Sequence, residues 1–266
     1  MNGMGSLLAP IISFITKMLV ITELEVRKLR HDPTELITRA IQPVLWLLVF
    51  GMVITQARAI PTGNLPYIDF LTPGVLAQSV LFVSIFYGIS IIWERDLGIV
   101  QKFLAAPIPR TALVAGKALS AGIRGLAEAS IIYLLALVLG VGVILNPLSI
   151  ICVIFVIIIG AALFSTLSLI IACLVKTRER FMGIGQMITM PLFFTSNAIY
   201  PIALMPEWLK IIAHGNPLTY MVDALRALMI DHGISEYGLL TDFGILIVMA
   251  IILIIIGARL YPRVIR

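Results

Sequence analysis

The chain has 266 residues, of which 60% are hydrophobic and only 12% are charged. An average soluble domain carries roughly 25% charged residues, and a mean hydropathy of +1.08 leaves too many apolar side chains for one soluble core, so this composition favours a membrane protein. The net charge of +5 does not indicate nucleic-acid binding, because the basic residues are scattered along the edges of apolar segments, where membrane proteins carry Lys and Arg.

The N-terminal stretch before Asp32-Pro33 has an apolar first half that is too short to span a membrane. Residues 10–32 alternate apolar side chains such as Ile12 with charged ones such as Arg27. We expect an amphipathic helix that lies in the membrane interface with its basic end toward the headgroups; a disordered cytoplasmic tail is the alternative. The chain therefore divides into an N-terminal cytoplasmic or interfacial segment, residues 1–33, and one transmembrane domain, residues 34–266.

Six apolar segments follow, each close to the ~20 residues that a transmembrane helix needs. The first begins after the helix-start pair Asp32-Pro33 and contains Gln42 and Pro43, which are tolerated if they face other helices. The sequence predicts an all-α polytopic fold with spans at residues 36–55, 70–92, 113–139, 148–175, 182–200 and 243–261.

A long semi-polar segment separates the fifth and sixth predicted spans. Residues 206–213 and 218–230 have helical periodicity within it, but Asp223 and Arg226 interrupt the second of these stretches. We expect two short helices half-buried at the outer membrane face, and the sequence does not determine whether they are re-entrant.

The positive-inside rule orients this arrangement. With the N-terminus in the cytoplasm, fifteen of the 19 Lys and Arg residues lie on that side and three, Arg58, Lys210 and Arg226, lie outside. Both termini are therefore predicted to be cytoplasmic. The fifteen are Lys17, Arg27, Lys28, Arg30, Arg39, Arg95, Lys102, Arg110, Lys117, Lys176, Arg178, Arg180, Arg259, Arg263 and Arg266.

The sequence shows no nucleotide-hydrolysing or catalytic motif. Its one Gly-Lys pair, Gly116-Lys117, is followed by Ala and has no Gly five residues earlier, so the Walker pattern fails. The three histidines, His31, His214 and His232, lie in separate polar segments, and the two cysteines fit no metal-binding spacing. We predict no catalytic residue, no metal site and no enzyme activity in the chain itself.

One pair of charged residues lies inside a predicted span. Arg124 and Glu128 are four positions apart and therefore share one helix face. An ion pair near the cytoplasmic end that stabilises helix packing is one interpretation. A polar feature of a translocation path or of a subunit interface is the other.

The most informative stretch, residues 93–110, is too polar to span the membrane and too apolar to be a fully solvated loop. Four apolar side chains recur in it at helical spacing, and two prolines then end the helix. A short rigid helix on the cytoplasmic face would offer a contact for another protein; an ordinary interhelical loop is the alternative. The residues concerned are Ile99, Val100, Phe103, Leu104, Pro107 and Pro109.

Two motifs give the chain a family resemblance. Glu94-Arg-Asp-Leu-Gly98, followed by Leu104 and Pro107, resembles the cytoplasmic loop of ABC-2 type exporter permeases, although Asp96 stands where many relatives have a second Glu. The outer segment is similar to that family's Asn-Pro-x-x-Tyr-x-x-(Asp/Glu)-x-x-Arg run. Its matching residues are Pro191, Asn197, Tyr200, Pro201, Asn216, Pro217, Tyr220, Asp223 and Arg226. The resemblance extends from about residue 36 to 263 and is closest to daunorubicin-resistance and nodulation-type permeases.

The resemblance implies a multi-pass subunit of an ABC exporter in the cell membrane. Two permeases would pair as a homodimer or a heterodimer and dock on two copies of a separate ATPase subunit, which holds the ATP and Mg²⁺; this chain would bind no cofactor. The substrate would be a drug, a lipid, a lipid-linked glycan or a polysaccharide, and it would move outward.

The same resemblance assigns roles to residues. A coupling helix near residues 94–106 would contact the ATPase, with the N-terminal helix beside it and the short outer helices narrowing the exit. Aromatic side chains of the outer half, namely Phe193, Phe194, Tyr200 and Tyr220, would stack on substrate or pack against lipid. The expected ATPase contacts are Glu94, Arg95, Asp96, Gly98, Lys102, Phe103, Leu104 and Pro107.

Other function classes have weaker support. A stand-alone secondary transporter needs intramembrane ionisable residues near the midplane or broken helices in paired halves, and Pro191 gives only a faint indication of the second. A membrane enzyme lacks a catalytic set. A membrane assembly subunit without transport of its own is the third alternative.

Overall fold

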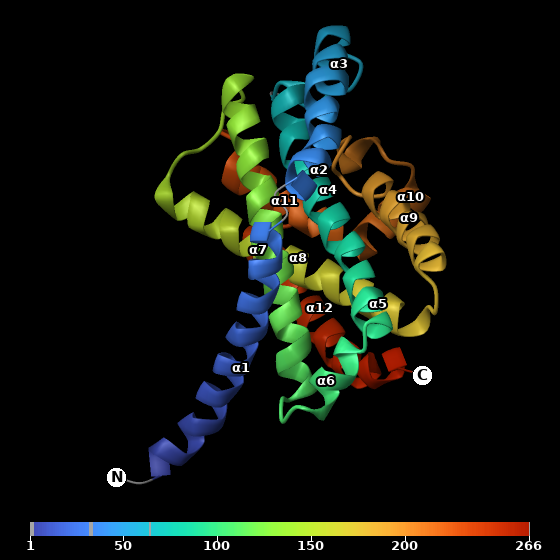
Figure 1. Ribbon diagram of the computed structural model, residues 1–266. Coiled ribbons are helices and arrows are strands. Elements are labelled where there is room, and N and C mark those ends of the chain that lie inside the picture. Colours follow the sequence, from blue (N-terminus) through green and yellow to red (C-terminus); the bar gives the residue numbers. More distant parts are fainter. Residues whose placement is uncertain (1–2, 32–33, 64, 266) are drawn as a thin grey trace.

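A computed structural model of the chain describes residues 3–31, 34–63 and 65–265. Nearly all of this part of the chain is helical, and its β-structure is limited to an isolated antiparallel bridge between Val143 and Ile230. The helices pack into one bundle, with α6 and the C-terminus at its lower end in Figure 1 and α3 at its upper end. The predicted all-helical architecture is confirmed.

Four helical segments in the described residues are long and apolar enough to cross a membrane. They agree with the second, third, fourth and sixth predicted spans to within a few residues at most ends. They are α4 with α5 (Tyr67–Tyr87 and Ile89–Asp96), α7 (Arg110–Val138), α8 (Pro147–Leu174) and α12 (Leu239–Leu260).

The other two predicted spans form shorter helices. The first folds as α2 (Thr34–Leu45), the π-helical turn η1 (Trp46–Gly51) and α3 (Met52–Ala57). A wider turn soon after Pro43 is physically reasonable, because proline removes a backbone donor from the helix. The fifth folds as α9 (Arg178–Phe194), which has 17 residues. The count of six spans thus stays a prediction, and the start at Asp32-Pro33 lies outside the described residues.

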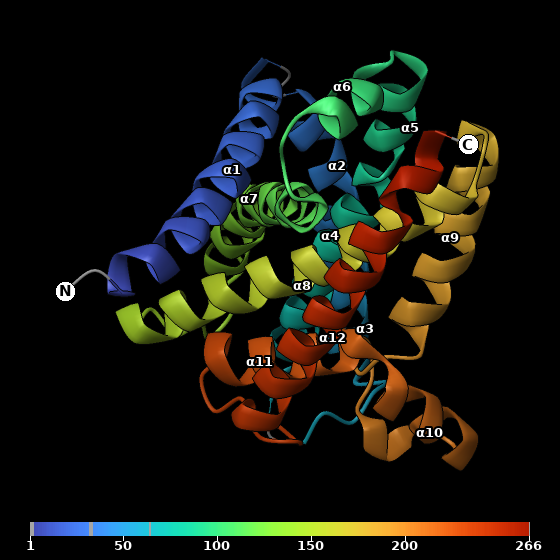
Figure 2. The ribbon, with the colours of Figure 1, turned by 90° about the horizontal axis from the view of Figure 1, so that it is seen from below.

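The N-terminal helix, α1 (Gly3–His31), is longer than the amphipathic stretch that we expected. It lies along α7, which Figure 2 shows nearly end-on. Gly116 allows this close contact, because a Cβ atom there would lie 2.8 Å from both the Met18 carbonyl oxygen and the Ile21 Cβ. The Thr22 hydroxyl also donates to the Gly116 carbonyl oxygen at 3.1 Å.

The single coupling helix that we expected at residues 94–106 is two helices. Glu94 belongs to α5, which ends at Asp96, and α6 (Ile99–Ala105) follows after a sharp turn. Gly98 makes this turn with φ of +71°, a left-handed conformation that glycine adopts without steric cost. The break places the Glu94-Arg95-Asp96 run at the end of the second span and leaves only Ile99–Ala105 as a separate helix.

The segment before the last span contains the two predicted short helices. They are α10 (Glu207–Gly215) and α11 (Pro217–Met229), preceded by the 3₁₀ turn η2 (Ile202–Leu204). The last span is followed by the 3₁₀ helix η3 (Tyr261–Ile265), in which Tyr261 and Val264 are buried. Arg266 lies outside the described residues.

We name the two ends of the bundle after their short helices. The α6 end comprises residues 93–117, 174–178 and 260–265, and the α10 end comprises residues 57–63, 65–67, 139–147 and 195–240. Between them α4 is central, with 78% of its most apolar stretch buried, whereas only 17% of the corresponding stretch of α12 is buried. A helix that is apolar all round and open on its surface needs a lipid environment.

Candidate functional site

A buried lysine joins three helices at the α6 end. Lys117 of α7 donates to the Glu94 carboxylate of α5 at 2.7 Å and to the Glu25 carboxylate of α1 at 3.3 Å. All three side chains are almost completely inaccessible. A charge is stable in such a place only when an opposite charge accompanies it, so this ion pair fixes how α1, α5 and α7 meet.

Aromatic and hydroxyl groups surround the lysine. The Lys117 Nζ lies 5.9 Å from the centroid of the Phe103 ring of α6. Deeper along α7, the Ser120 hydroxyl lies 3.1 Å from the Tyr87 hydroxyl of α4. The arrangement thus extends from α6 to α4 and links the separate short helix to the central helix of the bundle.

A second set of contacts holds the α5–α6 turn to the start of α9. The Asp96 carboxylate accepts from Arg95 at 3.0 Å and from Arg178 at 2.8 Å. Arg95 also donates to the Lys176 carbonyl oxygen at 2.7 Å, and the Arg178 guanidinium stacks over the Trp93 ring at 3.3 Å. These contacts therefore hold the α5–α6 turn against the start of α9.

The surface of the α6 end is apolar with basic edges. Leu97, at the turn, is 68% exposed, and Trp93 is 48% exposed. Beside them a groove of about 710 Å³ runs between α1 and α6, lined by Leu24 and Ile99 and bordered by Lys102. The Lys17 ammonium of α1 also donates to the Pro107 carbonyl oxygen, just after α6, at 2.9 Å.

The structure changes the assignment of several expected contact residues. Glu94 is buried and paired with Lys117, so it is not the surface contact that we expected. Phe103 and Leu104 are half-buried and pack against the core around Val100 and Tyr261, which leaves Leu97 as the most exposed apolar side chain of the turn. The residues that do reach the surface are Asp96, Lys102 and Pro107.

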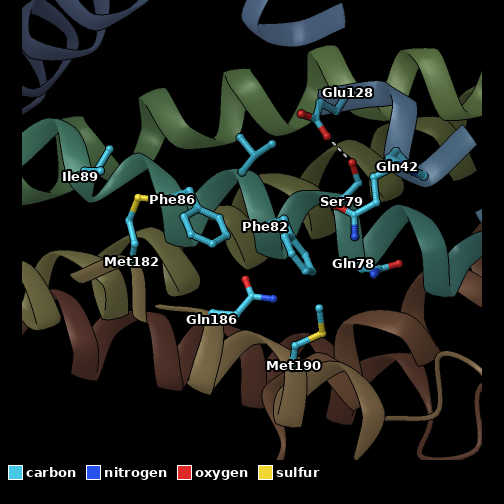
Figure 3. A pocket seen from close by; sticks show the side chains of 12 residues that line it. Gln42, Gln78, Ser79, Phe82, Phe86, Ile89, Glu128, Met182, Gln186 and Met190 are labelled. Atoms are coloured by element: carbon cyan, nitrogen blue, oxygen red, sulfur yellow. Dashed lines mark hydrogen bonds between the residues drawn. The ribbon is translucent and has the colours of Figure 1, made fainter. Parts of the chain in front are cut away.

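A groove of about 500 Å³ lies between α2, α4 and α9 (Figure 3); we call it the polar groove after the amides in its otherwise mostly apolar lining. Amide side chains enter it from three helices, namely Gln42 of α2, Gln78 of α4 and Gln186 of α9. Gln78 is 3% exposed, and its Oε1 atom has no hydrogen-bond partner among the described residues. The remaining lining is Pro43, Ser79, Phe82, Val83, Phe86, Ile89, Glu128, Met182 and Met190.

The predicted pair Arg124 and Glu128 lies on the face of α7 that is turned toward α4. Ser79 of α4 donates a hydrogen bond to the Glu128 carboxylate, and the Arg124 guanidinium lies 4.9 Å from the centroid of the Tyr87 ring. Glu128 lines the groove and Arg124 does not. The two residues therefore contact different parts of α4.

The outer motif forms a packed junction at the α10 end. Asn216 caps α11 by accepting from the Leu218 backbone N–H at 2.9 Å, and its amide donates to the Leu192 carbonyl oxygen at 2.7 Å and the Thr195 hydroxyl at 3.0 Å. Pro217 follows at the first helical position, where a missing N–H has no cost. One side chain thus starts α11 and attaches it to the end of α9.

Arg226 continues this junction. Its guanidinium lies over the Phe70 ring of α4 at 3.8 Å and donates to the Asn197 carbonyl oxygen at 2.7 Å. Tyr220 donates to the His214 carbonyl oxygen at 2.6 Å, and Tyr200 donates to the Phe194 carbonyl oxygen. The outer motif therefore holds helix ends together, with Pro201 starting the turn into η2.

Two buried carboxylates meet where α11 is joined to α12. The Ser235 hydroxyl lies 2.9 Å from an oxygen of Asp223 and 2.9 Å from an oxygen of Asp242. Because a hydroxyl has one proton to donate, both contacts are hydrogen bonds only when one carboxyl group is protonated. In the same loop, burial raises the pKa of Tyr237 to about 12, so its phenol stays protonated at neutral pH.

The four outer aromatic residues do not form one stacking surface. Phe193 is fully buried and packs edge-on against Trp46, with ring centroids 5.7 Å apart. Tyr220 is also buried, whereas Phe194 is 46% exposed. Packing inside the protein thus accounts for the positions of Phe193 and Tyr220, for which we had expected contact with substrate or lipid.

Sequence reasoning missed two features that the fold brings together. Lys117 was considered only as part of a Gly-Lys pair and as a cytoplasmic charge, and Glu25, Gln78 and Gln186 were not singled out. A lysine inside an otherwise apolar span is the pattern that could have indicated the buried pair, because such a charge needs a partner. The glutamines of separate spans are brought together only by the packing of α2, α4 and α9.

Comparison with known proteins adds independent findings. The sequence profile of the family described as ABC-2 type transporter matches residues 16–230. A putative transport permease, ycf38, of Cyanophora paradoxa is 27% identical over 95% of this chain and 90% of its own length.

Two bacterial relatives show a similar level of likeness. The daunorubicin resistance ABC transporter permease protein DrrB1 of Streptomyces coeruleorubidus is 27% identical over 89% of this chain and 81% of its own length. The inner membrane transport permease YadH of Escherichia coli K12 is 25% identical over 86% of this chain and 87% of its own length. Each of these matches covers most of both proteins.

Proposed function

Because the chain belongs to the ABC-2 type transporter family, and is thus a multi-pass membrane permease, we propose that it is the membrane subunit of an ABC exporter. It moves a drug, a lipid or a lipid-linked glycan or polysaccharide outward. The energy comes from ATP with Mg²⁺, hydrolysed by a separate ATPase subunit of which the complex holds two copies.

The observation that carries this proposal is the construction of the α6 end. Leu97 and Trp93 form an exposed apolar surface at the α5–α6 turn. The turn is held by the buried ion pair of Lys117 with Glu94 and by the surface ion pair of Asp96 with Arg178. A surface that transmits force must be both accessible and rigid. This surface meets both conditions, and it replaces Glu94 as the ATPase contact.

The topology of the exporter follows from the same arrangement. The shorter helices, α2 with α3 and α9, would complete six spans, with both termini and the α6 end in the cytoplasm. The charge distribution supports this orientation, since Lys102, Lys176 and Arg178 lie at the α6 end. The exposed apolar face of α2, η1 and α3, which includes Leu45, Val49 and Val53, would meet lipid or a second permease of the same or a related kind.

The mechanism is a transfer of motion from the ATPase to the spans. ATP binding closes the ATPase dimer and pushes on the α5–α6 turn. The push reaches α4 directly, because α5 continues it, and reaches α7 and α1 through Lys117. Energy enters as a difference in stability between two arrangements of the helices, so a loose connection at this point would uncouple hydrolysis from transport.

The experiment compares two matched variants of the chain, co-expressed with the ABC ATPase encoded nearest to its gene and purified in lipid. Leu97→Asp places a charge on the exposed turn. Leu240→Asp makes the same change at the α10 end, where the side chain is 90% exposed. We expect Leu97→Asp to reduce bound ATPase about tenfold, as for a central interface residue, and Leu240→Asp to leave it unchanged. Absence of ATPase from the wild-type complex, or equal effects of both variants, would contradict the proposal.

A further inference from the structure

Two fully buried carboxyl groups near the α10 end take no part in the function proposed above. Asp223 of α11 and Asp242 in the first turn of α12 are both 0% exposed. One oxygen of each, Oδ1, has no hydrogen-bond partner among the described residues. The other, Oδ2, lies 2.9 Å from the hydroxyl of Ser235, in the loop that joins the two helices. Two carboxylates buried so close together are costly unless one of them is neutralised.

The hydrogen-bonding capacity of Ser235 decides what neutralises the pair. The Gly238 backbone N–H donates to the Ser235 Oγ at 2.7 Å and uses one of its lone pairs. Because a hydroxyl has one proton and two lone pairs, it donates to one carboxylate, and its second lone pair accepts only from a carboxyl group that carries a proton. All three contacts are therefore satisfied together when Asp223 and Asp242 hold one proton between them.

The neighbours of the two carboxyl groups indicate which of them holds the proton. Asp223 Oδ2 also accepts from the Tyr237 backbone N–H at 3.1 Å, and Arg226 lies one turn further along α11. Burial lowers the pKa of Arg226 to about 10, which leaves its guanidinium charged at neutral pH. A hydrogen bond and a nearby cation both favour an ionised carboxylate, so Asp223 is the anion. The proton then lies on Asp242, which donates to Ser235.

We propose that Asp223, Ser235 and Asp242 form a one-proton latch. The latch holds α11 against α12 while the proton is present and opens when the proton is lost. It makes the α10 end of the bundle respond to the pH of the medium on that side. The proposal concerns this chain alone and does not depend on the exporter function.

The loop that carries Ser235 gives the medium access to the latch. Ser235 is half-buried, and Asp231 and His232 of the same loop are exposed. The two carboxyl groups, by contrast, are completely covered. A proton is therefore exchanged at the Ser235 side while the rest of the contact stays dry.

The other charged and titratable groups around the latch come from the elements packed against it. They are Tyr220 and Arg226 of α11, Glu236 and Tyr237 of the loop, and His214 of α10. Tyr67 and Asp69 of α4 bond to the backbone of Ile199 and Gly142. Helix α8, which packs against both α11 and α12, has no charged side chain, and the charged side chains of α7 contact α4 or lie at the α6 end. Of these groups, Arg226 is therefore the one that balances Asp223, which leaves no cation for an ionised Asp242.

The position of the latch determines what its opening does. Contacts of Asn216 and Arg226 already hold α11 to α9 and α4, and the latch adds the contact to α12. Ordinary aspartates lose their proton near pH ~4, so at neutral pH the folded chain binds a proton that the unfolded chain has lost. Stability that depends on such a proton falls as the pH rises. The latch is therefore closed at neutral pH and opens in alkaline medium.

The test is hydrogen–deuterium exchange of the full chain in detergent micelles, without ATPase or substrate. The reporters are the backbone amides of Tyr237 and Gly238, which donate to Asp223 and Ser235. Asp242→Asn keeps the side-chain shape, and its amide donates to Ser235 at any pH. Asp231→Asn is the matched control, because its side chain is 68% exposed in the same loop. Variants are compared at the same pH, so that the intrinsic exchange rate cancels.

We expect the wild type and both variants to exchange alike at neutral pH. In alkaline medium the wild type and Asp231→Asn should exchange about tenfold faster than Asp242→Asn, as for the loss of one buried hydrogen bond. A wild type that stays as slow as Asp242→Asn in alkaline medium, or an Asp231→Asn variant that matches Asp242→Asn, would overturn the proposal. Slower exchange of the alkaline wild type on addition of Na⁺ or Ca²⁺ would also overturn it, because a metal ion would then take the place of the proton.

Infrared spectroscopy detects the proton itself. A protonated carboxyl group has a carbonyl stretch that a carboxylate lacks, and a detergent without carbonyl groups leaves that region of the spectrum clear. We expect the wild type and Asp231→Asn to lose such a band between neutral and alkaline pH, and Asp242→Asn to lack it throughout. A neutral wild type without the band, or the same band in Asp242→Asn, would refute the latch.

Discussion

The Lys117 ammonium of α7 donates to the Glu94 carboxylate of α5 across 2.7 Å, in a place that solvent does not reach. The two residues are 23 positions apart in the chain, on either side of the exposed turn that includes Leu97. Their contact makes that turn a fixed part of the helix bundle. The Glu25 carboxylate, 3.3 Å from the same ammonium, extends the connection to the N-terminal helix.

The first prediction concerns this lysine. Lys117→Met removes the charge and leaves the Glu25 and Glu94 carboxylates buried without it. Loss of one partner of a buried ion pair costs about 3–5 kcal/mol, so we expect the free energy of unfolding to fall by about that amount. Denaturant unfolding of the purified protein in detergent, followed by tryptophan fluorescence, measures it.

The control for this prediction is another lysine in an ion pair. Lys210 pairs with Glu207 at 2.7 Å, but the Glu207 side chain is 86% exposed. Solvent screens an exposed pair, which therefore contributes little to stability, so Lys210→Met should have little effect. Equal losses in the two variants would show that burial of the Lys117 pair has no energetic significance.

The second prediction concerns the contact between α1 and α7. Gly116→Val would place side-chain atoms where the backbone of Met18 and the side chain of Ile21 lie, and overpacking of this kind costs about 1–3 kcal/mol. We expect α1 to move away from α7. Spin labels at Val20 and Lys102, which line the groove between α1 and α6, should show a longer or broader distance distribution in a cysteine-free background.

Gly244→Val is the matched control, since Gly244 lies in helix α12 with no atom within 4 Å of an added Cβ. It should leave the label distances unchanged. If Gly116→Val also leaves them unchanged, α1 is not held against α7 in the way that the structure indicates.

The third prediction compares two asparagines that start helices. Asn146 and Asn216 each cap a helix with proline at its first position, but only Asn216 also donates to residues of another element, Leu192 and Thr195. Loss of a cap costs about 1 kcal/mol, and each lost hydrogen bond in a buried place adds about 1 kcal/mol. Asn216→Ala should therefore destabilise the protein by about 2–3 kcal/mol and Asn146→Ala by about 1 kcal/mol, measured by the same unfolding assay. A larger loss in Asn146→Ala would mean that the outer motif does not hold α11 to α9.

The parts of the fold that the sequence predicts well are those determined by local composition. The four long spans are continuous apolar runs, and Pro217 and the periodicity that follows it determine the start of α11. Gly98 was noted as part of a motif, but the break that it makes between α5 and α6 was not predicted.

The parts that the sequence does not predict depend on contacts between distant residues. Glu94 has the same local pattern whether it faces solvent or Lys117, and only the packing of α5 on α7 decides between them. Gly116-Lys117 was examined for nucleotide binding, yet its glycine provides the space for α1 and its lysine holds Glu25. The polar groove likewise exists only when Gln42, Gln78 and Gln186 are brought together from three helices.

The central claim is that the α5–α6 turn is the cytoplasmic surface on which an ATPase docks. The most direct measurement is photo-crosslinking in living cells with a benzophenone amino acid placed at Leu97 or at Leu240, which are exposed at opposite ends of the bundle. The account predicts an adduct with the ABC ATPase from position 97 and none from position 240. An ATPase adduct from position 240, or none from position 97 in a cell that contains the assembled complex, would contradict it.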